Sequence, residues 1–300
     1  MRKPNFFLIG APKCGTTSFQ EYLTTHPSIF MSTPKELCYF DSDLPYPNSP
    51  KNENEYMDFF KNVTNNHSII GEASVGYLYS RVAVTNILSF NPEARFMVMI
   101  RNPIDMARSM HAYSVQVLEE NIEDFKEAWR LQEKRELGFY LPPTCYHRDF
   151  VLYGKLRKLG EQLQRLFHMV PREKVHVIIF DDLILNQSEV YHNALNFLGL
   201  ADDGRTNFSV KNATKTHRSK KVQYMLRMLL FARQKLPIRK FGIPVMNKLV
   251  TWNLRDESKT SIDADFRSEL AEYFKADVGL LSSLMSRDFS HWLKNRRPQI

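Results

Sequence analysis

The sequence lacks any long hydrophobic run. None of its apolar stretches approaches the roughly 20 residues that a membrane-spanning helix needs, so we expect no stable insertion into a membrane. Arg2 and Lys3 precede an apolar stretch, as in a signal peptide, but a glycine ends that stretch after residues 6–9. Because a secretory segment needs a longer apolar region, we expect a cytoplasmic protein.

Cysteine is scarce, and internal repeats and low-complexity tracts are missing. The three cysteines, Cys14, Cys38 and Cys145, lie far apart and form no CxxC pair. This spacing is not that of a zinc site, and it is typical of a reducing compartment. We therefore expect no structural zinc.

In one segment of the chain, basic residues far outnumber acidic ones. Residues 211–259 carry 13 Lys and Arg against two acids, whereas the rest of the chain has a net charge of −3. Such a segment attracts a phosphorylated cofactor, an acidic acceptor, nucleic acid or an anionic membrane. A solvated basic helical face is an equally open interpretation. Residues 212–256 show no clear strand, so we predict a basic cover of helices and loops at about 211–259.

Short apolar strands alternate with amphipathic helices along the rest of the chain. We predict a strand, loop and helix over residues 5–25, strands at 95–100 and 175–180, and helices near 156–167 and 189–198. This pattern predicts an α/β fold with a mostly parallel sheet. Residues 41–55 are rich in turn formers and are expected to form a surface loop. No linker divides the chain, so we predict one domain over residues 1–300.

The first strand leads into a loop that suits a phosphate. Gly10 and Gly15 bound this loop, and the hydroxyls of Thr16 and Thr17 begin a helix. Several backbone N–H groups and the positive end of the helix would point to one place. The glycine spacing is that of a P-loop, but Thr16 occupies the lysine position and the lysine is Lys13. The loop therefore predicts phosphate binding by a device different from that of an ATPase.

Two further polar elements follow candidate strands or lie near them. Arg101 ends the strand at 95–100, and Ser109 comes about two turns into the next helix. Lys35 and Glu36 lie in a loop after the first helix. Open α/β sheets bind ligands at the carboxyl ends of their strands, so we expect these residues near the glycine loop.

Taken in order, these motifs resemble the PAPS-dependent sulfotransferases, and most closely the bacterial and carbohydrate (heparan-sulfate-type) branch. The resemblance implies a P-loop-like three-layer α/β fold with a central, mostly parallel sheet flanked by helices. It also implies transfer, without a metal, of the sulfuryl group of 3′-phosphoadenosine-5′-phosphosulfate (PAPS) to a hydroxyl or amine, which leaves adenosine 3′,5′-bisphosphate (PAP). The matching segments are residues 11–17, 35–40, 101–109, 212–219 and 285–293.

The resemblance assigns the donor-binding residues. Lys13 matches the lysine of the 5′-phosphosulfate, where an ammonium can neutralise charge on the leaving oxygen. Arg101 and Ser109 match the residues that bind the 3′-phosphate, for which a guanidinium fork is well suited. The backbone N–H groups of the loop would hold the 5′-phosphate, and basic residues of the cover would reach the 3′-phosphate. These two sets are Cys14, Gly15, Thr16 and Thr17, and Arg218, Lys220 and Lys221.

Glu36 matches the glutamate base of the heparan-type branch. The steroid and phenol branch uses a histidine instead, and this chain has none between His67 and His111. The base would accept the proton of the acceptor as the oxygen–sulfur bond forms. Ala73 stands where heparan-type enzymes often have a lysine, and Lys35 is a candidate to replace that charge.

A saccharide or small-molecule acceptor is expected, and no nucleic acid. The candidate acceptor-binding residues are Lys35, Glu72, Tyr77 and His217. For Glu72 a structural hydrogen bond, and for Tyr77 a place in the core, are open alternatives.

Two other functions compete with this interpretation. A P-loop kinase or NTPase would need a magnesium-binding carboxylate, for which Asp181 or Asp182 could serve. A non-enzymatic polyanion-binding protein would use the basic segment and show steep salt dependence.

Overall fold

The structure is a computed structural model that divides into two compact units. The first comprises residues 1–106, 157–211 and 270–300, and the second comprises residues 107–156 and 212–269. One domain over residues 1–300 stays a prediction. The structure describes residues 2–44, 46, 48–145, 147–208, 215–217, 219, 222, 224–225, 228, 254–256 and 262–294.

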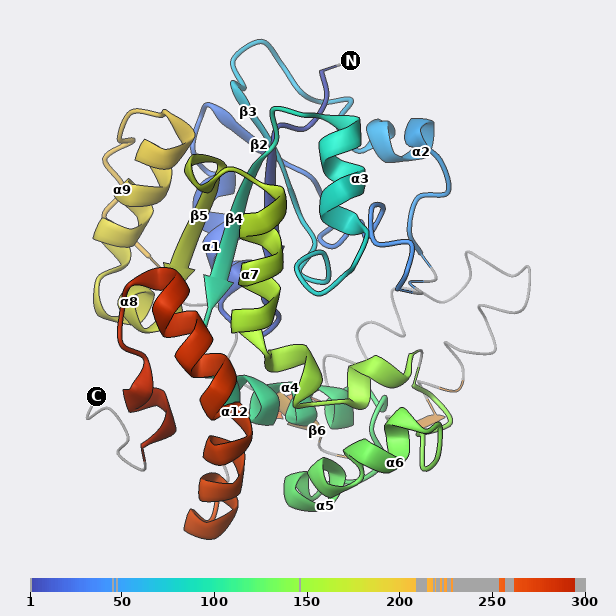
Figure 1. Cartoon of the computed structure of the whole chain (residues 1–300). Coiled ribbons are helices and arrows are strands. Elements are labelled where there is room, and N and C mark those ends of the chain that lie inside the picture. The colour runs from blue at the N-terminus through green and yellow to red at the C-terminus, as the bar shows by residue number, and fades with distance from the viewer. Residues whose placement is uncertain are drawn as a thin grey trace. The chain divides into compact units, whose positions relative to one another are not determined.

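The first unit is built on a five-stranded sheet with the order β2-β3-β1-β4-β5, in which every neighbouring pair is parallel (Figure 1). The predicted parallel sheet is therefore confirmed. The strands are almost entirely apolar, and all five residues of β1 are buried, as expected when helices cover both faces of a parallel sheet. The strands are β1 (Phe6–Gly10), β2 (Ile29–Met31), β3 (Ile69–Ala73), β4 (Arg95–Ile100) and β5 (Val175–Ile179).

Helices flank both faces of this sheet. In Figure 1, α3 and α7 lie in front of the strands and α1 lies behind them. The helices of this unit are α1 (Thr16–Thr24), α2 (Glu53–Asp58), α3 (Ala83–Phe90), α7 (Leu159–Met169), α8 (Phe180–Leu185) and α9 (Gln187–Leu198), with the short 3₁₀ helices η3 (Arg172–Lys174) and η4 (Ser290–Leu293). Two longer helices, α4 (Pro103–Gln116) and α12 (Ala264–Met285), continue from one unit into the other, and η2 (Lys155–Arg157) lies at a boundary.

Local signals account for several helix ends. The side chain of Asn52 accepts a hydrogen bond from the Glu55 N–H and starts α2, so the predicted loop over 41–55 is wrong at its last residues. The side chain of Asn186 starts α9 in the same way, and Gly199 ends it in the left-handed conformation with φ 73°.

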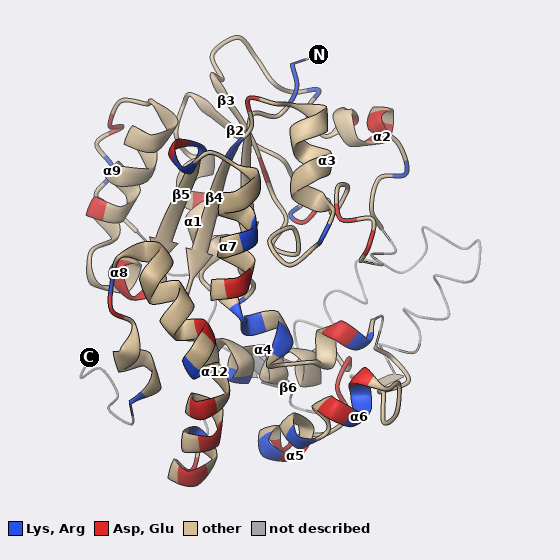
Figure 2. Ribbon diagram, viewed as in Figure 1, with Lys and Arg blue, Asp and Glu red and all other residues tan. Residues whose placement is uncertain are grey.

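Charged residues lie mostly on the helices and loops around the sheet (Figure 2). The five strands of the first unit contain only two, Arg95 at the start of β4 and Glu72 inside β3. Because burying a charge is costly unless partners satisfy it, Glu72 must have a specific role.

The second unit contains α5 (Phe125–Arg130), α6 (Gln132–Glu136), η1 (Arg148–Val151) and a short antiparallel pair, β6 (Lys215–His217) with β7 (Leu254–Asp256). This pair corrects the prediction that residues 212–256 hold no strand. Three-residue strands are too short for a periodic signal. Among the described residues, no helix is long and apolar enough to cross a membrane.

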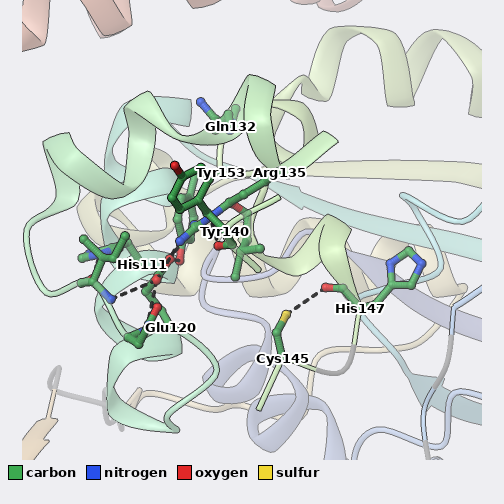
Figure 3. Close-up of polar contacts among 12 residues, drawn as sticks. His111, Glu120, Gln132, Arg135, Tyr140, Cys145, His147 and Tyr153 are labelled. Atoms are coloured by element: carbon green, nitrogen blue, oxygen red, sulfur yellow. Dashed lines mark hydrogen bonds and ion pairs between the residues drawn. The ribbon is translucent and has the colours of Figure 1, made fainter. Parts of the chain in front are cut away.

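A buried ion pair organises the second unit (Figure 3). Arg135 donates from Nη1 and Nη2 to the two carboxylate oxygens of Glu120 at 2.6 and 2.9 Å, and the Tyr153 hydroxyl donates to Oε2 at 2.9 Å. Burial acts to raise the pKa of Glu120, but these hydrogen bonds and that of the Ile122 N–H outweigh it and lower the pKa. The carboxylate therefore stays ionised inside the protein.

We expect Glu120→Ala to lower the free energy of unfolding by about 3–5 kcal/mol, because it leaves the Arg135 guanidinium buried without its carboxylate. Chemical denaturation measures this loss. Glu136→Ala is the control, since its ion pair with Lys155 is half exposed and should contribute about 0–1 kcal/mol. Since the folded pKa of Glu120 lies below its ordinary value of 4.5, this contribution should be present above pH 4.5 and be lost as the pH falls further. Equal losses in the two variants would contradict the assignment.

Candidate active site at the carboxyl edge of the sheet

The candidate residues of the first unit follow the carboxyl ends of its strands. Because the strands are parallel, these ends share one edge of the sheet, where open α/β sheets bind ligands. The glycine loop follows β1, the Lys35–Glu36 loop follows β2, Val75 follows β3, Arg101 follows β4 and Phe180 follows β5.

The glycine loop turns sharply into α1. Lys13 and Gly15 adopt left-handed backbone conformations with φ 67° and 84°. A Cβ atom on Gly15 would also lie 2.9 Å from the Phe180 ring, so this position requires glycine. The first N–H groups of α1 have no acceptor within the helix. Binding of a phosphate by Thr16 and Thr17 stays a prediction.

Cys14 fits the prediction less well. Its N–H donates to the Ala11 carbonyl at 3.3 Å, so this amide is already used within the loop. Its side chain is fully buried, and burial raises the pKa of the thiol to about 12. Cys14 is therefore a neutral packing residue of the loop.

Lys13 and Arg101 meet, as the sequence predicts. Nη1 of Arg101 donates to the Lys13 carbonyl at 3.1 Å, and its guanidinium carbon lies 4.5 Å from the centre of the Phe180 ring. The pKa of the Lys13 ammonium is lowered first by burial and then by the positive charges of Arg101 and Arg157. The structure therefore gathers three cations at the loop. No motif in the sequence marks Arg157, which is fully buried.

Lys35 adds a fourth cation. Its ammonium donates to the Thr16 hydroxyl at 2.8 Å and to the Thr17 hydroxyl at 3.4 Å. Burial and the nearby charge of Lys13 lower its pKa, whereas Glu36 raises it. Lys35 thus lies at the first turn of α1, where it can supply the charge that Ala73 lacks.

Glu36 lies beside this ammonium. Its Oε2 accepts a hydrogen bond from the Val75 N–H at 3.2 Å, and its Oε1 lies 3.9 Å from the Lys35 ammonium. About a third of its side chain (31%) is exposed. Burial raises the pKa of the carboxyl, with Lys35 and the Val75 N–H acting in the opposite direction. A carboxylate with a raised pKa that solvent can reach is suited to accept a proton.

Glu72 and Tyr77 have a different role from the predicted contact with an acceptor. They are 1% and 0% exposed. Glu72 accepts hydrogen bonds from the hydroxyls of Tyr56, Ser74 and Tyr77 at 2.7, 2.6 and 2.8 Å. Both side chains are engaged inside the protein, which argues against contact with an acceptor, and we reassign them as positioning residues.

The hydroxyls that bind Glu72 hold the loop that carries Glu36. Oγ of Ser74 accepts the Cys38 N–H at 3.0 Å. The Tyr77 hydroxyl accepts the N–H groups of Tyr39 and Phe40 at 2.9 and 3.3 Å. Glu72 therefore anchors the residues that immediately follow the candidate base.

The carboxylates that could mark a magnesium site are engaged in other contacts. Asp182 accepts two hydrogen bonds from Arg287 at 2.6 and 2.8 Å. Asp181 accepts one from the Trp292 indole N–H at 2.6 Å. Within the described residues, no group of His, Cys, Asp and Glu is arranged to hold a metal ion. These contacts argue against the kinase or NTPase interpretation.

The remaining predicted residues belong to the second unit or lie outside the described residues. Ser109 lies on α4 in the second unit, and its contact with a 3′-phosphate stays a prediction. Arg218, Lys220 and Lys221 lie outside the described residues, as does most of the basic cover. His217 is the last residue of β6, and its side chain is also outside them.

Comparison with known proteins agrees with this geometry. The family model described as "Sulfotransferase domain" matches residues 3–240. The chain belongs to the sulfotransferase family. A crystal structure of a sulfotransferase from Alicyclobacillus acidocaldarius superposes with a TM-score of 0.74 at 25% identity, covering 98% of this chain and 100% of that one. Mouse sulfotransferase SULT7A1 shares the fold with a TM-score of 0.50 at 14% identity, covering 95% of this chain and 90% of that one.

Curated relatives match over parts of their length. The membrane-associated sulfotransferase kil1 of Dictyostelium discoideum is 32% identical over 120 residues, which are 39% of this chain and 24% of that protein. Human bifunctional heparan sulfate N-deacetylase/N-sulfotransferase 2 is 31% identical over 118 residues, with coverages of 37% and 13%. Rat carbohydrate sulfotransferase 15 is 26% identical over 250 residues, with coverages of 66% and 44%. The matches thus span less than half of each of these relatives.

We expect Tyr77→Phe to loosen the loop that follows Glu36, because the N–H groups of Tyr39 and Phe40 lose their acceptor. Hydrogen exchange at these two amides should accelerate roughly ten-fold or more, as an unsatisfied buried donor costs about 1–3 kcal/mol. Tyr191→Phe is the control. Its buried hydroxyl bonds Asp203 at 3.1 Å in the same unit, so its loss should leave both amides unchanged. Unaltered exchange in Tyr77→Phe would remove Tyr77 from this role.

Proposed function

We propose that this sulfotransferase uses PAPS as donor and transfers its sulfuryl group to a hydroxyl or amine of a saccharide or small-molecule acceptor. The proposal rests on the clustering of Lys13, Lys35 and Arg101 at the N-terminus of α1. Such a site favours an anion with more than one charged group. The mouse fold relative is described in complex with PAP, and two of the curated relatives are named for saccharide substrates.

In this proposal, the donor is bound by Lys13, Lys35 and Arg101 together with the N-terminus of α1. The N–H groups and hydroxyls of Thr16 and Thr17, with the N–H of Gly15, hold the 5′-phosphate. The ammonium groups of Lys13 and Lys35 neutralise the charge that grows on the leaving oxygen. Arg101 binds the 3′-phosphate. Ser109, Arg218, Lys220 and Lys221 complete this phosphate site in the proposal.

Glu36 acts as the base. Its carboxylate accepts the acceptor proton while the acceptor oxygen or nitrogen bonds to sulfur, and the bond from sulfur to the phosphate oxygen breaks in line with that attack. The Val75 N–H and Lys35 keep the carboxylate oriented. The raised pKa that burial gives Glu36 increases its basicity at neutral pH. No metal is needed, because the side-chain cations carry the positive charge.

Donor binding is tested first, in a thermal-shift panel of PAP, ATP with magnesium, and AMP. We expect PAP to raise the melting temperature well above the effect of AMP, because only PAP offers both phosphates to Lys13 and Arg101. Lys13→Ala and Arg101→Ala should each reduce the PAP shift. A shift by ATP with magnesium that exceeds the PAP shift would support a kinase or NTPase instead.

The base is tested with Glu36→Gln. We expect kcat to fall by roughly 10² to 10⁴, with the PAP shift preserved, because the amide keeps its size and cannot accept the proton. In the parent enzyme, activity should decline as the pH falls through the raised pKa of Glu36. Glu93→Gln is the control, since Glu93 is exposed and pairs with Lys174. Parent-like turnover by Glu36→Gln would show that another group is the base.

A further inference from the structure

A segment near the end of the described chain forms hydrogen bonds with the first turn of α8, which follows β5. Arg287 donates two hydrogen bonds to Asp182 at 2.6 and 2.8 Å, and the indole N–H of Trp292 donates to Asp181 at 2.6 Å. We call residues 287–292 the C-terminal clamp. The proposed chemistry assigns no role to this segment, which the sequence singles out only through its family resemblance.

One branch of the clamp leads to Phe180. Asp181 and Asp182 lie in the first turn of α8, which begins at Phe180. Holding the two carboxylates therefore fixes the position of the Phe180 ring. The Arg101 guanidinium stacks on this ring, with 4.5 Å from its carbon to the ring centre, so the ring is the platform that supports Arg101.

The second branch leads to Asn102. Its Nδ2 donates to the Trp292 carbonyl at 2.8 Å, and its Oδ1 accepts the Ile104 N–H at 2.9 Å. Asn102 is only 8% exposed, and it is the chain neighbour of Arg101. The clamp thus holds Arg101 from both sides, through its neighbour in the chain and through the ring on which it stacks.

The Trp292 side of the clamp is shielded from solvent, whereas the Arg287–Asp182 pair is partly exposed. Trp292 is 2% exposed and stacks on Phe289 with 4.4 Å between ring centres. Hydrogen bonds to carboxylates in such surroundings are among the stronger ones in proteins. The clamp can therefore fix the direction of a long, otherwise adaptable arginine side chain.

We propose that the C-terminal clamp positions Arg101 to bind the 3′-phosphate of the donor, with Arg287 and Trp292 as positioning residues that do not touch the donor. This inference rests on the proposed function. The glycine loop keeps its own hydrogen bonds, from the Ala11 N–H to the Met99 carbonyl and from the Cys14 N–H to the Ala11 carbonyl, so loss of the clamp acts on the 3′-phosphate end of the site.

The test compares the binding of PAP and AMP by calorimetry, because AMP lacks the 3′-phosphate. Trp292→Phe removes the indole N–H but keeps a ring against Phe289, and Arg287→Met removes the bonds to Asp182 at a partly exposed position. In each variant we expect PAP to bind roughly ten-fold more weakly and AMP to bind as it does to the parent. A general loosening of the site would weaken both ligands equally and would overturn the proposal.

Two control variants test whether the effect is specific to the clamp, and the parent protein tests the proposed function. Lys174→Met removes an exposed ion pair of 3.0 Å with Glu93 at the other end of β5, and it should bind both ligands normally. In an Arg101→Ala background, Trp292→Phe should have no additional effect on PAP, since the clamp acts through Arg101. A parent protein that binds PAP and AMP equally would refute the proposed function. A parent that prefers PAP, together with clamp variants that keep the same preference, would refute the clamp alone.

Discussion

The bond from Arg101 to the Lys13 carbonyl is the constraint on which the site depends. It joins the loop after β1 to the end of β4, and these strands are neighbours in the sheet. It also keeps two positive charges close together. Burial lowers the pKa of Lys13 most, and the charge of Arg101 lowers it further. Like charges held at short range repel one another, and an anion placed between them relieves that repulsion. The fold itself therefore holds these positive charges in an arrangement that favours an anion between them.

Two buried glutamates show how the protein satisfies charge in its interior. Glu120 is held by a guanidinium, and its pKa is lowered despite burial. Glu72 is held by three hydroxyls, and burial raises its pKa. The first arrangement keeps a fixed charge in the second unit. The second organises the loop behind Glu36 with weaker, neutral donors, so the candidate base is not faced by an additional buried cation.

Signals confined to a few neighbouring residues made part of this structure predictable. Apolar runs of five or six residues predict β1, β4 and β5, and Pro103 begins α4 as proline can. The order of glycine, lysine and threonine predicts the phosphate loop. Arg101 is expected beside this loop because open α/β sheets bind ligands at the carboxyl ends of their strands. The resemblance to sulfotransferases extends these local signals to the whole fold.

Contacts between distant segments could not be read in the same way. Nothing in the residues around Glu72 indicates that three hydroxyls surround it, because Tyr56 comes from α2 and only the fold brings it there. Arg157 and Phe180 join the site from separate elements without a motif of their own. β2 has only three residues, so it shows no period that could distinguish it from a loop.

The strand order places two groups of site residues on opposite flanks of β1. β4 and β5 lie on one flank of β1 and carry Arg101 and Phe180, whereas β2 and β3 lie on the other and lead to Glu36 and Val75. The two flanks meet at Lys35, which follows β2 and donates to the hydroxyls of Thr16 and Thr17. Changes on the β2–β3 flank that spare Lys35 can therefore alter the surroundings of Glu36 while the cations at the glycine loop stay in place.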